Sequence, residues 1–89
     1  MAYRRPFTPQ QRREATRAYR SYGKHRFELR QSYPPRTSEQ REVLVHYGHA
    51  IHEMAAELRK PDRLVDVDAL NRADAWARWL AIEYRQLQQ

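Results

Sequence analysis

Four basic side chains recur about once per helical turn near the start of the sequence, at Arg13, Arg17, Arg20 and Lys24. On a helix they share about 60° of arc and form one continuous row, which we call the basic ridge. The spacing of its members is close to that of phosphates along a nucleic-acid strand, so several phosphates can be contacted at once. The ridge therefore predicts phosphate binding, against the alternative of an ordinary solvated helix face.

Further basic and aromatic residues surround the ridge. Arg4, Arg5 and Arg12 extend it beyond the start of the predicted helix, as an arm that reaches neighbouring phosphates or a minor groove. Aromatic rings among basic residues can stack on unpaired bases, although packing within the protein is the simpler alternative. The aromatic residues in question are Tyr3, Phe27 and Tyr33.

The charge is concentrated in the first part of the chain. Residues 1–36 carry ten Lys or Arg against two Glu, a net charge of +8, whereas residues 37–89 carry seven basic and nine acidic residues, a net charge of −2. Fifteen of the seventeen basic residues are Arg, whose planar guanidinium binds phosphate through two parallel bonds. A GC-rich genome would also explain the excess of Arg over Lys, but it does not explain the clustering, which points to an anionic partner.

A row of histidines in the middle of the chain is the candidate metal site. His46, His49 and Glu53 share about 60° of a helix surface, which would suit one metal ion. Structural zinc sites usually draw ligands from two elements, and an exposed helix face offers them no supporting partners. His52 and Glu53 open the metalloprotease motif H-E-x-x-H, but Ala56 stands at its closing position. We interpret the row as solvated histidines and predict no metal.

No combination of residues predicts catalysis. The chain has no cysteine and only two glycines, which excludes thiolate chemistry and a glycine-rich phosphate loop. Asp66 and Asp68 read as a helix start, not as a general acid and base. We therefore expect a protein that is not an enzyme, without a cofactor or a small-molecule substrate.

The ridge must be positioned by a first helix. Thr8, Pro9 and Gln11 form a helix start with a capping box, and the apolar period continues to about residue 31. Gly23 weakens this helix by about 1 kcal/mol relative to Ala, so a break after Tyr22 is the alternative. The inward face is expected to carry Ala15, Ala18, Tyr19, Tyr22 and Leu29.

Two more helices are predicted to form a hairpin. Pro34 and Pro35 end the first helix and make residues 32–37 a turn. Thr37 or Ser38 then caps a helix over about 39–59 that runs through Gly48, and Asp66 or Asp68 caps a helix that extends to near the carboxyl end. The segment that links these two helices contains Arg63–Val67, which has the strongest strand signal in the chain.

The fold class expected is all-α, with an antiparallel hairpin of the second and third helices and the basic first helix packed across it. Residues 1–8 would form the basic arm and residues 9–89 a single small domain. The matching apolar series of the hairpin predict a core, whose members are Leu44, Tyr47, Ile51, Met54, Leu70, Ala77, Leu80 and Tyr84.

Some apolar residues fall outside the predicted core. Ala75, Trp79 and Ile82 lie about 120° or more from the apolar stripe of the third helix, and Val45 is similarly displaced on the second. Fifteen Leu, Ile, Val and Phe residues make a thin core, so association is expected to add burial. We predict that Ala75, Trp79 and Ile82 form a protein interface in a homo-oligomer or a larger assembly; the alternative is that the first helix covers Trp79.

The function expected from these features is non-catalytic binding of the nucleic-acid phosphate backbone, DNA or RNA, with little sequence preference. The alternative is a helical adaptor or inhibitor of a larger protein that handles nucleic acid, such as a phage or mobile-element accessory protein. The absence of cysteine, of a long apolar run and of an apolar leader segment predicts a cytoplasmic protein without a membrane partner.

Overall fold

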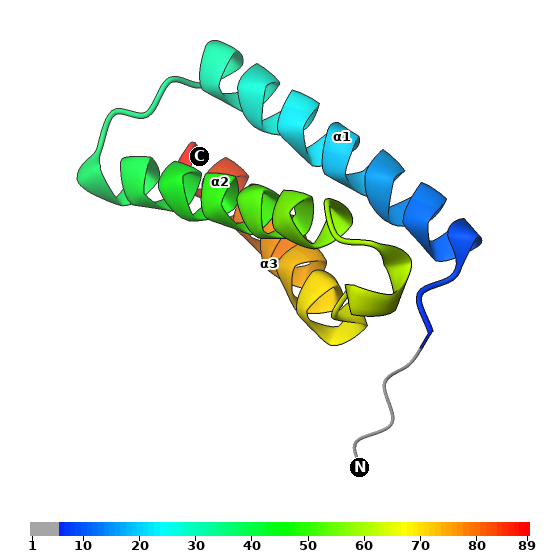
Figure 1. Cartoon of the computed structure of the whole chain (residues 1–89). Coiled ribbons are helices and arrows are strands. Elements are labelled where there is room, and N and C mark those ends of the chain that lie inside the picture. The colour runs from blue at the N-terminus through cyan, green and yellow to red at the C-terminus, as the bar shows by residue number, and fades with distance from the viewer. Residues whose placement is uncertain (1–5) are drawn as a thin grey trace.

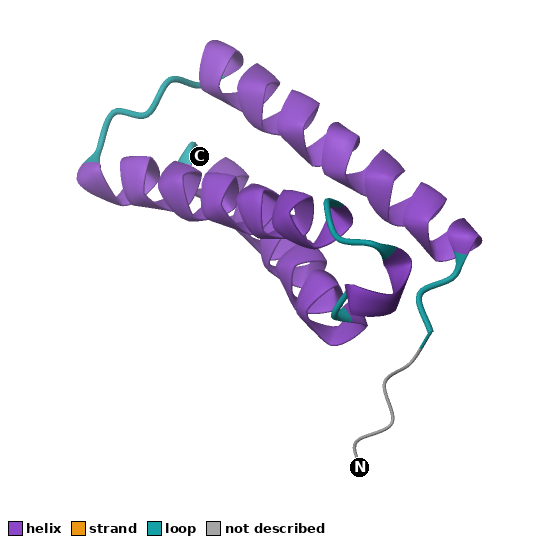
Figure 2. Ribbon diagram, in the orientation of Figure 1, coloured by secondary structure: helices purple, strands orange, loops and turns teal. Residues whose placement is uncertain are grey.

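The computed structural model describes residues 6–89, which form three helices and one short turn (Figure 1). The helices are α1 (Pro9–Ser32), α2 (Ser38–Leu58) and α3 (Val67–Leu87), and a 3-10 turn η1 (Asp62–Leu64) precedes α3. Figure 2 shows no strand in the described part of the chain, and of the Arg63–Val67 segment the first four residues lie in the connection between α2 and α3 while Val67 begins α3. The all-α prediction is confirmed.

Side-chain caps start each of the three helices. The Thr8 hydroxyl accepts a hydrogen bond from the Gln11 amide at 3.1 Å, and the Gln11 side chain accepts one from the Thr8 amide at 2.9 Å. Thr37 and Gln40 form the same capping box at the start of α2. Asp66 caps α3 by accepting from the Ala69 amide at 3.0 Å. These caps satisfy amide groups that have no partner within a helix, so they set where each helix begins.

Both glycines lie inside continuous helices. α1 passes through Gly23 and α2 through Gly48, and neither residue has a positive φ. The predicted alternative of a break after Tyr22 is therefore wrong. The cost of one glycine is small compared with the packing of a 24-residue helix.

The helices run up, down and up, and α2 and α3 pack most extensively as an antiparallel hairpin (Figure 1). α1 lies across this hairpin and packs more closely on α2 than on α3. The buried Gln40 ties the ends of the bundle together, because its side chain donates to the Leu87 carbonyl and accepts from the Arg36 and Thr37 amides. No helix among residues 6–89 has the length and apolar character needed to cross a membrane.

The core has two connected clusters. One brings Leu29 of α1 against the first half of α2 and the second half of α3, and the other gathers Phe7, Met54 and Val65 near the α2–α3 connection. Of the eight core residues predicted, seven are buried; Ile51 is only partly buried and packs at the edge of the first cluster. Phe7 is 6% exposed, so the packed domain begins inside the segment that we had assigned to the basic arm.

Tyr47 is a buried polar anchor at the centre of the bundle. Its ring is completely buried, and its hydroxyl donates to the Tyr22 carbonyl at 3.3 Å, with Nδ1 of His25 3.2 Å from the same oxygen. Burial, and then the neighbouring Tyr22 hydroxyl, raise the pKa of Tyr47 to about 12. The hydroxyl therefore stays protonated at neutral pH and holds α1 against α2.

Glu57 organises the connection between α2 and α3. Partial burial acts to raise its pKa, but hydrogen bonds from the Lys60 ammonium and the Asp66 amide outweigh this effect and lower the pKa below its ordinary value. The carboxylate is therefore ionised at neutral pH and holds the connection in place just before the cap of α3.

Candidate nucleic-acid interface

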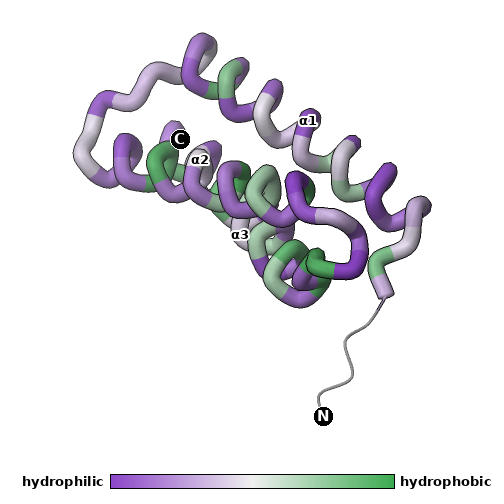
Figure 3. The backbone as a smooth tube through the Cα atoms, viewed as in Figure 1, coloured by the Kyte–Doolittle hydropathy of each residue, from purple (hydrophilic) through white to green (hydrophobic). Residues whose placement is uncertain are grey.

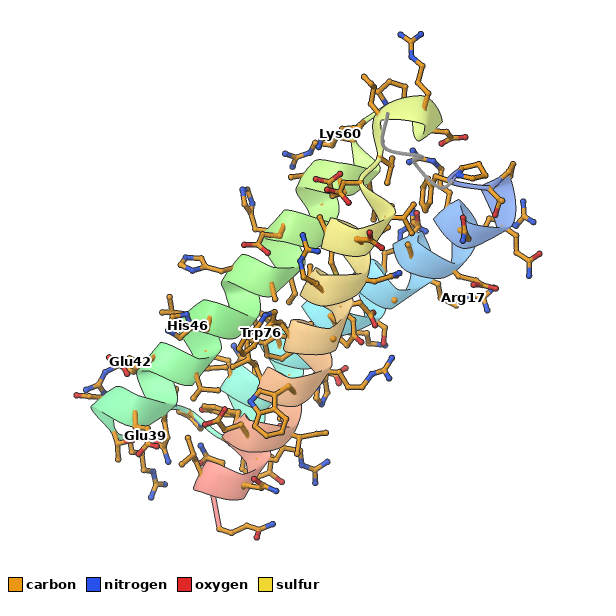
Figure 4. All side chains as sticks on the ribbon, turned by 90° about the horizontal axis from the view of Figure 1, so that it is seen from below. Arg17, Glu39, Glu42, His46, Lys60 and Trp76 are labelled. Carbon is orange, nitrogen blue, oxygen red and sulfur yellow. The ribbon has the colours of Figure 1, made fainter. Side chains whose placement is uncertain are left out.

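The basic ridge lies on the outward face of α1. All four of its side chains are exposed, on the side of the helix opposite Tyr22 and Leu29, which face the hairpin. Figure 4 shows Arg17 pointing away from α2 and α3. α1 is also the most hydrophilic of the three helices (Figure 3). From Arg13 to Lys24 the ridge extends for about 16 Å along the helix axis.

The ridge side chains are not used by the fold. Within residues 6–89, none of the four makes a hydrogen bond or an ion pair. Residues 9–32 carry seven basic and two acidic residues, and these two, Glu14 and Glu28, lie on one flank of the ridge. Glu14 accepts from the Gln10 side chain at 3.2 Å. The outward face of α1 thus keeps a net positive charge that no contact within the described chain neutralises.

Arg12 differs from its neighbour Arg13, although both are basic residues of the first turns of α1. Its guanidinium donates to Oδ1 of Asp62 at 2.7 Å, to the Leu58 carbonyl at 2.7 Å and to the Lys60 carbonyl at 2.8 Å. It also lies 5.2 Å from the centre of the Phe7 ring. These contacts close the carboxyl end of α2 and fasten α1 to the α2–α3 connection, so we do not include Arg12 in the proposed interface.

Arg26 is a second arginine of α1 that serves the fold. Its Nε donates to the Leu44 carbonyl at 2.9 Å, and its guanidinium lies against Gly48, where an added Cβ would come within 3.3 Å of it. Gly48 thus makes room for the guanidinium between α1 and α2. Helical periodicity could have indicated that Arg12 and Arg26 serve the fold, since both fall beside the apolar stripe of α1 and not on the ridge.

The structure places two of the aromatic residues that were predicted to stack on bases in different surroundings. Phe27 is 63% exposed and lies one turn after Lys24, beside the ridge. Tyr33 follows α1 and accepts a hydrogen bond on its carbonyl from the Tyr84 hydroxyl, so its backbone serves the packing of α3. The candidates Tyr3, Arg4 and Arg5 lie outside the described residues.

The histidine row lies on the side of α2 away from α1. The rings of His46 and His49 have centroids 6.1 Å apart and meet edge to face, and with Glu53 they border a hollow of about 350 Å³ between α2 and α3. Among residues 6–89, no three His, Asp or Glu side chains are grouped closely enough to hold a metal ion.

The apolar residues predicted as an interface are exposed. Trp79 is 59% exposed, Ile82 52% and Val45 50%, and Ala75 also lies at the surface. α1 lies on the opposite side of α3, where the Tyr22 hydroxyl donates to the Asp74 carbonyl. The alternative in which the first helix covers Trp79 is therefore wrong.

Trp76 belongs to the same surface, and the sequence analysis missed it. It is 57% exposed and lines two adjoining hollows, one with Arg72, Ala75 and Trp79 and the other with the histidine row. Its spacing of four residues from Arg72 and three from Trp79 could have predicted that the three side chains share one face of the helix.

Comparison with protein-family models, with curated proteins and with solved structures finds no match for this chain. The evidence for a function of this chain therefore lies in its own surface.

Proposed function

We propose that the protein binds nucleic acid without catalysis, through the phosphate backbone, and that the basic ridge of α1 is its contact surface. The observation that carries the proposal is that four exposed basic side chains share one face of α1 while other arginines of the helix are used in packing. Holding these charges side by side costs electrostatic energy, which an anionic partner would offset.

The chemistry of the ridge suits phosphates better than base edges. Three of its members are arginines, which bind a phosphate through two parallel hydrogen bonds, and Lys24 adds a point charge. A straight row on one exposed helix follows a strand of phosphates, and such contacts carry no sequence information. We therefore expect binding that has little sequence preference and weakens steeply with salt.

Phe27 adds a preference for single strands to this proposal. Its ring is exposed beside Lys24, at a place where a base freed from a duplex can stack on it. Stacking on an aromatic side chain contributes about 1–3 kcal/mol per base, and a paired base cannot supply it. Phe27→Ala should weaken binding to a single strand and leave binding to a duplex unchanged.

The decisive experiment reverses the charge of the ridge. Arg13→Glu, Arg17→Glu and Arg20→Glu together should abolish binding to single and double strands, measured by fluorescence anisotropy across a salt series. Each of the three changed singly to Ala should lower the slope of log affinity against log salt by about one unit. Circular dichroism should report the same helix content for all variants, because none of these side chains makes a hydrogen bond or an ion pair within residues 6–89.

A matched control separates the ridge from net charge. Arg41→Glu, Arg59→Glu and Arg63→Glu change the charge by the same amount at exposed positions outside α1. This control should retain most of the binding. If both triple variants lose binding equally, net charge is responsible and the ridge is not the contact. If the triple ridge variant binds like the parent, the ridge is not the contact surface. If the parent itself binds neither single nor double strands, the nucleic-acid proposal fails and the adaptor hypothesis, with an acidic protein surface on α1, replaces it.

A further inference from the structure

Four residues of α3 form a second row at the surface, on the side away from α1; three of them are exposed and Glu83 is half-buried. Arg72, Trp76, Trp79 and Glu83 follow one another at steps of four, three and four residues and share about 60° of arc. We call them the tryptophan stripe. Trp76 and Trp79 are 57% and 59% exposed, and they are the two tryptophans of the chain. Two large aromatic side chains together at a surface are typical of an interface.

The stripe is complementary to itself. Arg72 and Glu83 are equally far from its midpoint, and so are Trp76 and Trp79. When two such helices pack antiparallel about a two-fold axis through this midpoint, Arg72 of one copy faces Glu83 of the other, and Trp76 faces Trp79. A parallel arrangement would instead set each charge against a like charge.

We propose that the tryptophan stripe is the interface of a two-fold symmetric dimer, in which the α3 helices of two copies of this chain pack antiparallel. Within residues 6–89, neither Arg72 nor Glu83 has an ion-pair partner. In the dimer, the second copy supplies the partner of each. The small Ala75 lies beside the stripe, where it leaves space for Ile82 of the second copy. This inference does not depend on nucleic-acid binding.

The neighbouring surface fits this arrangement. The stripe borders a shallow, mostly apolar hollow of about 530 Å³ beside Ala75 and a second hollow of about 350 Å³ beside His46 and His49, so a tryptophan of the second copy meets a shallow depression on either side of Trp76. Figure 4 shows Trp76 and His46 on the same side of the hairpin, with α1 behind it. The patch involves one helix and the edge of another, which is small for a permanent dimer, so the association is reversible and depends on concentration.

Tryptophan fluorescence measures the association directly, because both tryptophans lie in the stripe. As concentration rises from nanomolar to millimolar, the emission maximum should shift to shorter wavelength, and the sedimentation mass should double over the same range. Trp79→Ala should weaken the association strongly without changing helix content. Phe27→Ala removes an equally exposed aromatic side chain from α1 and should leave association unchanged.

Charge exchange tests the antiparallel pairing. Arg72→Glu alone and Glu83→Arg alone each create two pairs of like charge in the dimer, and each should raise the dissociation constant at least about tenfold. Mixed together, the two variants should form a heterodimer of near-parental affinity, because every facing pair is again of opposite charge. The double variant Arg72→Glu with Glu83→Arg should also dimerise by itself.

Three outcomes would overturn the proposal. A chain that stays monomeric up to millimolar concentration shows that this face is not an interface between copies. Association that is unaffected by Trp79→Ala shows that the contact lies elsewhere. Single charge variants that remain weak when mixed show that α3 does not pair in the antiparallel register.

Discussion

Neighbouring arginines of α1 have different roles, although they are chemically identical. Arg12 gives three hydrogen bonds to the α2–α3 connection, and Arg26 fills the space above Gly48. Arg13 and Arg17 project from the outward face of α1 with no hydrogen-bond or ion-pair partner in the described chain. The direction of each side chain from the helix axis decides between structure and binding, because a guanidinium that can reach acceptors of the fold is no longer available to a ligand.

Arg12→Ala should destabilise the protein by about 1–3 kcal/mol, because it leaves the Leu58 and Lys60 carbonyls without this donor and removes the cover of Phe7. Arg13→Ala is the matched control and should change stability by no more than about 0.5 kcal/mol. Urea unfolding followed by circular dichroism measures both. Equal midpoints for the two variants would contradict the structural role of Arg12.

At the scale of the helices, neighbours in the chain determine where each helix begins, and contacts between helices determine which interior positions tolerate a larger side chain. The capping boxes at Thr8 and Thr37 set the helix starts through groups three residues away. The two interior glycines are distinguished only by what packs against them: an added Cβ at Gly23 meets no atom of residues 6–89 within 4 Å, whereas one at Gly48 meets the Arg26 guanidinium. Packing against Arg26 therefore explains Gly48, and no contact within residues 6–89 explains Gly23.

Gly23→Ala should stabilise the protein by about 1 kcal/mol, the gain in helix propensity, since the methyl group enters open space. Gly48→Ala gains the same propensity but pushes the Arg26 guanidinium away from the Leu44 carbonyl. It should therefore melt several degrees below Gly23→Ala, given about 4–8 °C per kcal/mol for a domain of this size. A Gly48→Ala variant that melts at or above Gly23→Ala would show that Arg26 adjusts without loss.

At the scale of the whole molecule, a thin core lies between two surfaces of different chemistry. α1 presents the basic ridge on one side, and the hairpin presents the tryptophan stripe and the histidine row on the other. A dimer through α3 would leave both ridges exposed on its outer sides, so the two proposals are compatible. The core between the surfaces is shared by all three helices, and we expect it to unfold as one unit.

Leu44→Ala should cost about 2–5 kcal/mol, a large part of the total stability of so small a domain. Leu44 is 4% exposed and its neighbour Val45 is 50% exposed, so Val45→Ala is the matched control and should cost at most about 0.5 kcal/mol. Thermal melts of the two variants measure the difference. Similar melting temperatures would mean that Leu44 does not belong to the core.

Features that depend on neighbours in the chain could be predicted from the residues alone. Capping residues, prolines and helical periodicity predicted the three helices to within one or two residues at most ends, and periodicity alone predicted the exposed face of the basic ridge. These signals are local because a helix is stabilised by contacts three or four residues apart.

How the faces of different helices meet became known only from the packing of the three helices. Arg12 finds its three acceptors 46 to 50 positions further along the chain, and helical periodicity contains no information about them. The same holds for Ile51, which lies at the edge of the core, and for Trp79, which stays exposed because α1 packs on the other side of α3. An apolar stripe specifies that a helix face is buried, but the partner that buries it is set by the fit of all three helices together.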